Sequence, residues 1–221
     1  VVRRLTVPEG LTSAQVLASC FNQDGSNPGY SASNFYCSQI ERNAGTGRID
    51  NLYKPTYNMG SLETNGIDLQ LDWAGELGNR AGLGAGAGIS WVDNYDVQTL
   101  KGGIVYDYAD SVGYVPEWKA VSHVRYAQGP VSVGLRWRYL GAMQHSSKVT
   151  NPASTTPGID AYSYFDLFGN WKLSDTFSFR AGINNLLDKE PPQVGGTPGA
   201  TQASTYDIYG RQFFVGVTIN L

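Results

Sequence analysis

The amino-acid sequence predicts an all-β fold, in which about eight antiparallel strands form a segment of a transmembrane β-barrel. Apolar and polar residues alternate with a period of two along most of the chain, and short turns alternate with long connections. No run approaches the roughly 18 apolar residues of a membrane helix. Only 16% of the 221 residues are charged, whereas 27 Gly and 14 Tyr favour strands, turns and interfaces.

The amino-terminal segment contains little regular strand. Residues 1–7 are expected to form a short strand ended by Pro8, and residues 8–46 an irregular segment with a short helix at Ser13 to Cys20. In an oxidising compartment Cys20 and Cys37 would form a disulfide that ties this segment into a lobe, whereas in the cytosol both would be thiols. No signal peptide opens the chain, so we expect a removed export signal or a longer protein.

The remaining strands are expected where one parity is apolar and the other polar. In one of them, Val131, Val133 and Leu135 alternate with Ser132, Gly134 and Arg136. Four glycines at 82, 84, 86 and 88 share one face of another strand, where they would leave room for bulky groups. The expected strands are 48–73 (interrupted near Met59 and Gly60), 82–91, 118–126, 131–139, 160–173, 177–184 and 213–221.

The connections between these strands alternate in length. Short turns at 74–80, 128–130 and 173–176 separate long connections at 93–115, 142–159 and 189–205, which is the arrangement of periplasmic turns and external loops in outer-membrane barrels. Aromatic residues gather near both ends of the strands, as in two interfacial girdles. The outer set is Trp91, Trp118, Tyr139 and Tyr162, and the inner set is Trp73, Tyr126, Trp171 and Phe177.

The last nine residues form a strand with one unbroken apolar row. Phe213, Val215, Val217, Ile219 and Leu221 make up this row, and Gly216 lies five positions before the end. A final strand of this kind resembles the assembly signal of outer-membrane β-barrels.

Two segments near the carboxyl end are similar to the closing hairpin of TonB-dependent outer-membrane receptors. They read A-G-I-N-N-L-L-D-K-E-P-P from Ala181 to Pro192 and Y-D-I-Y-G-R-Q-F-F-V-G-V-T-I-N-L from Tyr206 to Leu221. In that family an Asn-Leu-x-Asp-Lys strand end, an external loop and a Tyr-x-x-x-Gly-Arg entry to the last strand recur in this order. The run from Asn58 to Asp68 resembles a descending strand of the family, and the segment around both cysteines resembles a bridged external loop of some members.

The resemblance implies that residues 1–221 are the carboxyl-terminal section of a receptor barrel of about 22 strands, with residues 8–46 as a disulfide-tied extracellular loop. It implies the bacterial cell outer membrane and active uptake of a scarce solute, such as a ferric siderophore, an oligosaccharide or a cofactor. The implied partners are outer-membrane lipid, the remainder of the receptor (plug and other strands) and the TonB system acting through the plug. The candidate contacts for a small-molecule substrate are Tyr95, Tyr106, Tyr108, Arg136 and Arg138.

Other kinds of site have weaker support in the sequence. His123 with Ser122 or Asp166 would be a hydrolase pair, but we interpret His123 as one polar lumen residue, and we expect no enzyme activity, catalytic residue, bound cofactor or metal site. Asp107 and Asp110 are interpreted as solvated acids, with a calcium or ligand site as the alternative. The net charge of −3 and the pI near 5.3 argue against nucleic acid as a partner.

Two further interpretations of the whole chain remain. An autonomous eight-stranded outer-membrane barrel would serve as an adhesin or a small porin. A secreted β-sandwich binding module would bury Ile89, Leu135 and Trp137 in a protein core.

Overall fold

A computed structural model describes residues 2–54, 56–78, 81–99, 104–194 and 201–220. The chain divides into two compact units. The first, here called the barrel unit, comprises Val1–Arg3, Glu63–Val97 and Tyr106–Leu221. The second comprises Arg4–Leu62 and Gln98–Val105 and contains the disulfide lobe, which we define as residues 11–53. None of the helices in the described ranges is long and apolar enough to cross a membrane.

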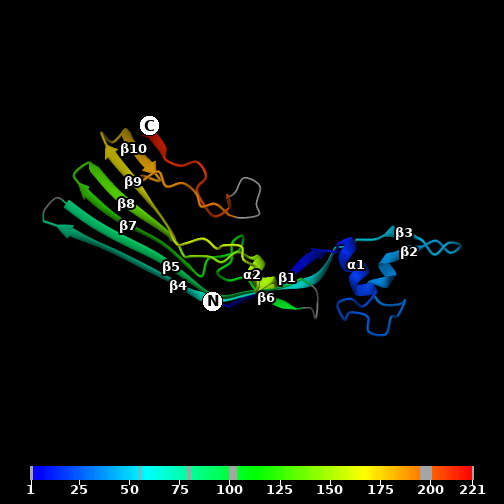
Figure 1. The fold of residues 1–221 in the computed structure, drawn as a ribbon. Coiled ribbons are helices and arrows are strands. Elements are labelled where there is room, and N and C mark those ends of the chain that lie inside the picture. The colour runs from blue at the N-terminus through cyan, green and yellow to red at the C-terminus, as the bar shows by residue number, and fades with distance from the viewer. Residues whose placement is uncertain (1, 55, 79–80, 100–103, 195–200, 221) are drawn as a thin grey trace. The chain divides into compact units, whose positions relative to one another are not determined.

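Eight strands follow one another in a single sheet in the order β1-β4-β5-β7-β8-β9-β10-β11, which confirms the predicted number and the all-β class. The pairs from β5 to β11 are antiparallel, and each joins strands that are consecutive along this path (Figure 1). The short strand β6 (Val105–Asp107) pairs with β5 off this path. The bounds are β1 (Val2–Gly10), β4 (Thr56–Leu77), β5 (Ala81–Gln98), β7 (Trp118–Gln128), β8 (Val131–Leu140), β9 (Tyr162–Lys172), β10 (Phe177–Asn184) and β11 (Gln212–Ile219).

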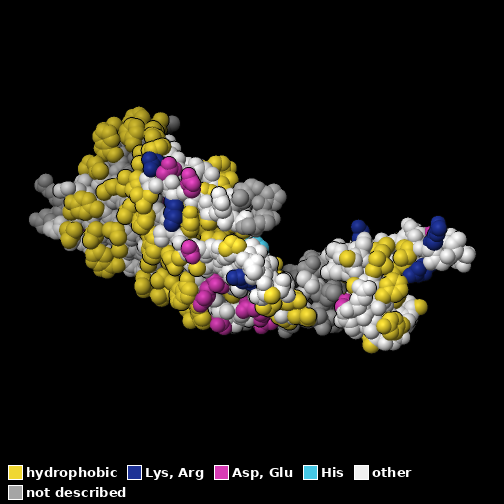
Figure 2. Space-filling view, viewed as in Figure 1, with side chains coloured by type: hydrophobic (Ala, Val, Ile, Leu, Met, Phe, Trp, Pro, Cys, Tyr) yellow, Lys and Arg dark blue, Asp and Glu magenta, His cyan; other side chains and the backbone are white. Residues whose placement is uncertain are grey.

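The strand register gives the sheet one apolar and one polar face. Val133 lies opposite Tyr126 and Gly169, and Trp91 lies opposite Trp118, so residues of the apolar parity share a face across neighbouring strands. These side chains are exposed: Val133 retains 45% and Val215 79% of its accessible surface. Figure 2 shows apolar side chains spread over the surface of this strand region. The β-sandwich interpretation required Ile89, Leu135 and Trp137 in a protein core, but Leu135 retains 43% of its accessible surface and Ile89 and Trp137 are only partly buried, which contradicts that interpretation.

Glycines on the polar face lie beneath large side chains of the neighbouring strands. A Cβ atom added at Gly134 would lie 2.3 Å from the ring of Phe168, and one at Gly182 would lie 2.4 Å from the ring of Phe214. Gly86 provides the same space beneath the ring of His123. The expected room for bulky groups is thus present at Gly86, and the register places each glycine directly opposite the residue that covers it.

Several strand boundaries differ from the predicted ones. Strand β1 continues through Pro8 to Gly10, so the expected end of this strand at Pro8 is wrong. Strand β4 runs through Met59 and Gly60 without a break, and the helix α2 (Ser147–Thr150) was not predicted. Strand β5 extends to Gln98 because β6 pairs with it, so the connection starts later than residue 93.

The predicted face of Tyr162 and the predicted end of the last strand also differ from the structure. Tyr162 lies opposite Leu140 and shares the face of Tyr164 and Asp166, so it does not belong to an outward-facing girdle. Strand β11 ends at Ile219, and Leu221 lies outside the described residues. The role of the final apolar row as an assembly signal stays a prediction.

The disulfide lobe has a small core of its own. Thr12 caps the helix α1 (Ser13–Cys20), because its hydroxyl accepts from the Gln15 backbone N–H while the Gln15 side chain accepts from the Thr12 N–H. After α1 come the 3₁₀ helix η1 (Cys37–Gln39) and a hairpin of β2 (Ile40–Arg42) and β3 (Ile49–Leu52). The predicted helix is confirmed, and its buried face packs in a cluster of Leu11, Val16, Cys20 and Tyr36.

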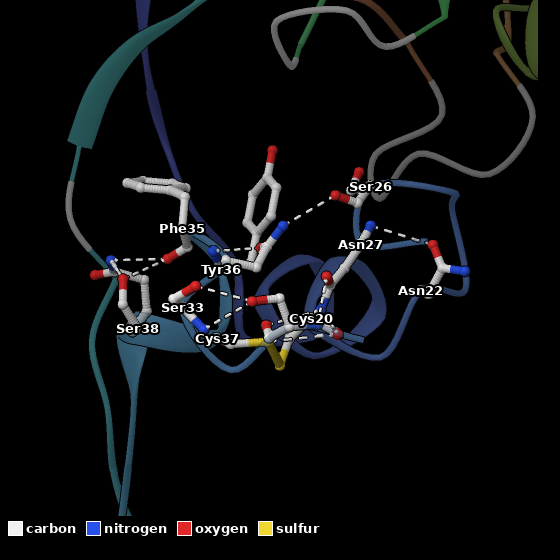
Figure 3. Close-up of a disulfide and its surroundings, with 12 residues drawn as sticks. Cys20, Asn22, Ser26, Asn27, Ser33, Phe35, Tyr36, Cys37 and Ser38 are labelled. Atoms are coloured by element: carbon white, nitrogen blue, oxygen red, sulfur yellow. Dashed lines mark hydrogen bonds between the residues drawn. A yellow bond between two sulfur atoms is a disulfide. The ribbon is translucent and has the colours of Figure 1, made fainter. Parts of the chain in front are cut away.

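A disulfide joins α1 to η1. Cys20 and Cys37 are bonded, with their Cα atoms 4.8 Å apart, and they lie 17 positions apart in the sequence (Figure 3). The predicted disulfide is confirmed, and it closes the loop of residues 20–37 beside the small core cluster.

Replacing Cys20 and Cys37 together by Ala is expected to lower the free energy of unfolding of the lobe by about 3 kcal/mol, because the bridge restricts the unfolded loop. Hydrogen exchange would show faster exchange within residues 11–53 and unchanged exchange in β7 to β10. Equal protection of the lobe in the variant and the parent would contradict this expectation.

Candidate functional site

The polar face of the barrel unit is organised around one buried carboxylate. Asp166 lies in β9, directly opposite Arg136 of β8, and its side chain retains only 3% of its accessible surface. Arg138 is the next residue of β8 on the same face. The sequence predicted both arginines as lumen residues but did not assign Asp166 as their partner.

Four hydrogen bonds satisfy the Asp166 carboxylate. Its Oδ2 accepts from Nε of Arg136 and from Nε of Arg138, both at 2.8 Å, and its Oδ1 accepts from Nη2 of Arg138 at 3.0 Å. The backbone N–H of Asn185 donates to Oδ1 at 2.8 Å. A buried carboxylate is tolerated when it is paired and fully hydrogen-bonded, and here the two guanidinium groups remain partly exposed to water. This cluster of Arg136, Arg138, Asp166 and Asn185 is called the Asp166 cluster.

Asn185 connects the Asp166 cluster to the hairpin that follows β10. Its backbone is left-handed, with φ of 51°, and its amide side chain accepts from the Lys189 N–H and donates to the Lys189 carbonyl, both at 2.9 Å. Asn is among the residues that adopt this conformation most readily, because its short side chain bonds to nearby backbone. The turn after β10 is therefore fixed by the two hydrogen bonds between the Asn185 side chain and the Lys189 backbone, and by the bond from the Asn185 N–H to Asp166.

Asp188 closes the other end of the same hairpin. Its backbone is also left-handed, and its carboxylate accepts from the backbone N–H of Arg211 at 2.8 Å. Gly210 has φ of 68°, and a Cβ atom there would lie 3.0 Å from Oδ1 of Asp188. The Asn-Leu-x-Asp and Gly-Arg segments that carried the family resemblance are thus two sides of one contact.

An aromatic layer lies next to the Asp166 cluster. The guanidinium carbon of Arg138 is 4.8 Å from the ring centroid of Tyr164, and Nη2 of Arg138 is 3.9 Å from the Asp207 carboxylate. The backbone N–H of Asp207 donates to the hydroxyl of Tyr164 at 3.2 Å. Lys189 lies over the ring of Tyr162, its ammonium 3.9 Å from the centroid. The basic residues here act on aromatic rings as well as on carboxylates.

The long connections pack together in a second core. It includes residues from the connections after β6, β8 and β10, so three predicted long loops share one hydrophobic cluster. Burial, followed by the nearby Tyr164 and Tyr162, raises the pKa of Tyr206 to about 12, so its phenol stays neutral at physiological pH. The cluster consists of Val112, Leu140, Met143, Ile159, Val194 and Tyr206, with Tyr162 packed against it.

Four tyrosines form a second group, with Tyr95 near the end of β5, Tyr106 in β6, and Tyr108 and Tyr114 between β6 and β7. The rings of Tyr108 and Tyr114 stack with centroids 4.0 Å apart, and Tyr95 and Tyr106 lie 6.0 Å from Tyr114 and 6.3 Å from Tyr108. Asp107 fixes this arrangement, because its carboxylate accepts from the backbone N–H of Tyr95 at 2.9 Å. Burial, followed by the proximity of Tyr108, raises the pKa of Tyr114. These four side chains, called the tyrosine group, offer stacking surfaces and phenol hydroxyls.

The predicted contact residues therefore fall into two separate sets. Tyr95, Tyr106 and Tyr108 come together in the tyrosine group, which also includes Tyr114, a residue that the sequence analysis did not select. Arg136 and Arg138 belong to the Asp166 cluster, where they bind a carboxylate of the protein. Whether either set contacts a substrate stays a prediction.

The residues considered for a hydrolase or metal site, His123, Asp166 and Asp107, have other neighbours in the structure. His123 is opposite Gly86, with Asp72 near the same position, and the Asp166 oxygens are occupied by the two arginines and Asn185. Asp107 binds backbone N–H groups of Tyr95 and Ala109. Within the part of the chain that the structure describes, no group of three or more His, Cys, Asp or Glu side chains is arranged to hold a metal ion.

Comparisons with known proteins place these features in one family. A family model described as TonB dependent receptor-like, beta-barrel, matches residues 17–186. Vitamin B12 transporters BtuB from strains of Vibrio cholerae are 31% identical over 122 residues, which cover 55% of this chain and 18% of each transporter. The chain therefore spans less than a fifth of the length of these curated relatives.

A solved structure supports the fold. A mutant of the ferric enterobactin receptor PfeA from Pseudomonas aeruginosa matches with a TM-score of 0.52 and 20% sequence identity. The match covers 81% of this chain and 26% of that receptor. At this identity the likeness concerns the fold alone, and it supports the barrel architecture of the sheet.

The Asp166→Asn substitution is expected to destabilise the barrel unit by about 2–3 kcal/mol, because it removes charge-assisted hydrogen bonds to both arginines. Thermal unfolding would show a lower midpoint, and hydrogen exchange would rise in residues 185–211. Combining it with Arg138→Gln should cost less than the sum of the single changes.

A matched control is available in the turn after β9. Asp175 bonds to Lys172 at 2.7 Å, but its side chain is 99% exposed. Asp175→Asn should therefore leave the unfolding midpoint unchanged. Equal effects of the two Asp→Asn changes would contradict a central role for Asp166.

Proposed function

Because the chain belongs to the TonB-dependent receptor-like β-barrel family, we propose that it forms part of the wall of an outer-membrane transporter that takes up a scarce solute. The observation that carries this proposal is the two-faced antiparallel sheet, with exposed apolar rows on one face and the Asp166 cluster on the other. Such a sheet suits a barrel whose outer face meets lipid and whose inner face lines a polar lumen. The family is one of receptors and transporters rather than enzymes.

The proposal assigns a side of the membrane to each end of the strands. The long connections that share the core of Val112 and Met143 would face the cell exterior, and the short turns would face the periplasm. A solute arriving from outside would then meet the packed connections and the tyrosine group first. The Asp166 cluster would hold the base of the closing hairpin on the inner side of the wall.

The solute class is proposed from the family and from the side chains at this end. Ferric siderophores, oligosaccharides and cofactors are the candidates, since aromatic rings of the tyrosine group can stack on rings of such molecules. Entry would require the plug, the other strands and the TonB system, which are partners outside these 221 residues. Outer-membrane lipid would contact the apolar rows of β7 to β11.

Uptake should depend on the TonB system. The full-length protein that contains this chain would be produced in cells lacking their own copy, and uptake of labelled ferric siderophores, cobalamin and oligosaccharides would be measured with and without TonB. We expect at least one solute to accumulate only when TonB is present. Recovery of the protein in a soluble fraction, or uptake that is independent of TonB, would contradict the proposal.

The tyrosine group should contribute to solute affinity. Replacing Tyr108 and Tyr114 together by Ala removes the stacked pair, and we expect a two- to tenfold weaker equilibrium affinity, on the order of 0.5–1.5 kcal/mol. Tyr209→Ala is the matched control, because Tyr209 is 76% exposed and lies outside the group. Loss of affinity in the control alone would assign solute contact to the closing hairpin instead.

A further inference from the structure

We propose that the disulfide lobe carries a small-molecule site of its own, for a ligand that combines a flat ring with an anionic group. The lobe has a pocket of about 370 Å³, a size within the range of small-molecule sites. The pocket belongs entirely to the second unit, so it does not rest on the transport proposal. It is lined by Cys20, Phe21, Tyr30, Ala32, Cys37, Ile40 and Arg42.

The walls of this pocket are apolar although they face water. Phe21 retains 46% and Tyr30 retains 69% of its accessible surface, and both rings border the same depression. The disulfide and Ile40 supply further apolar lining. Exposed aromatic rings around a concave apolar surface are typical of a site that is covered when a ligand binds, because burial of the rings then stabilises the complex.

One cation supplies polarity at the pocket. The guanidinium carbon of Arg42 is 5.8 Å from the Phe21 ring centroid, and Nη1 of Arg42 donates to the Gly47 carbonyl at 2.9 Å. Glu41, the adjacent acid, instead accepts from Asn51 and Tyr53, so its charge is directed to other groups. No carboxylate pairs with Arg42 among the residues whose placement the structure gives. An arginine has five N–H donors, so Arg42 has donors beyond the Gly47 bond.

The pocket is pre-formed by a buried asparagine. Asn27 is 3% exposed, and its amide donates to the carbonyl of Cys20 at 2.8 Å (Figure 3). The same amide donates to the carbonyl of Ser31 at 3.2 Å, while its Oδ1 accepts from the Ser31 N–H at 2.9 Å. The Tyr30 N–H donates to the Asn27 carbonyl at 2.9 Å. Asn27 thereby joins both sides of the loop that presents Tyr30.

Tyr30 itself has a strained backbone. Its φ is 48°, a left-handed value that a bulky residue adopts only at a cost, and its ring is nevertheless largely exposed. Folding alone gives no reason for an exposed ring at a strained position, where Asn or Gly would be more stable. A ligand contact supplies that reason, and the fixed loop lowers the entropy lost when the ligand binds.

These features select the ligand class. A flat apolar or sugar ring would stack on Phe21 or Tyr30, and a carboxylate or phosphate on the same molecule would accept from Arg42. A cationic ligand is disfavoured, because Arg42 would repel it. The charge of the ligand is therefore the property to test.

The test measures binding of naphthoate and of uncharged naphthamide to the full-length, detergent-solubilised protein by ligand-observed NMR. We expect saturable naphthoate binding that is at least about fivefold tighter than naphthamide binding, because only the carboxylate can accept from Arg42. Arg42→Gln should remove this preference. Tyr30→Asn should weaken both probes while leaving the lobe folded, since Asn tolerates the left-handed backbone.

Two variants on the same hairpin serve as controls. Arg48→Gln removes an exposed cation outside the pocket, and Tyr53→Phe removes only a hydroxyl that bonds to Glu41. Both should bind the two probes as the parent does, and intact Cys20–Cys37 bonding in each variant would be checked by mass under non-reducing conditions. Absence of saturable binding at millimolar naphthoate, equal affinity for both probes, or an undiminished preference in Arg42→Gln would overturn the proposal.

Discussion

The pairing of Asp166 with two arginines is the contact on which the described polar face depends. A carboxylate that is almost fully buried in a strand would be strongly unfavourable alone, but here every strong acceptor direction is used by Arg136, Arg138 or the Asn185 backbone. Because β8 supplies both arginines, β9 the carboxylate and the hairpin after β10 the Asn185 N–H, the bonds also fix how these three segments meet. Arg138 also contacts the ring of Tyr164 and the carboxylate of Asp207, and it thereby connects the Asp166 cluster to the long connection after β10.

The same interaction links the wall to the packed connections. The hairpin leaves the wall at Asn185, returns at Arg211, and is held at both points by carboxylates, Asp166 at the first and Asp188 at the second. Between these points the chain contributes Val194 and Tyr206 to the core that residues of two other connections share. Connections of this length are usually variable and mobile, but here they are packed and hydrogen-bonded like part of a domain.

The sequence was informative where a pattern repeats and less so where one residue chooses a partner. Alternation with a period of two predicted the bounds of β7, β8 and β10 nearly to the residue, because a shift by one position would exchange the apolar and polar faces of the strand. It could not place the continuation of β5, which depends on pairing with β6, or the pairing of Asp166, which depends on register. Arg136 and Arg138 were correctly predicted on the polar face. Tyr114 was missed, because no fixed spacing in the sequence indicates that two rings stack, as those of Tyr108 and Tyr114 do. Tyr162 shows that strand parity, rather than residue type, decides which face of the sheet an aromatic side chain occupies.

The glycines opposite Phe168, Phe214 and His123 have a consequence for the inner dimensions of such a wall. Each large side chain lies flat over a neighbouring backbone rather than standing upright, so the lining is thin although it contains rings. The clear width inside the wall is therefore set by pairs of positions rather than by single residues. Exchanging the two members of a pair, such as Gly134 and Phe168, would conserve total volume while moving a ring from one strand to the next.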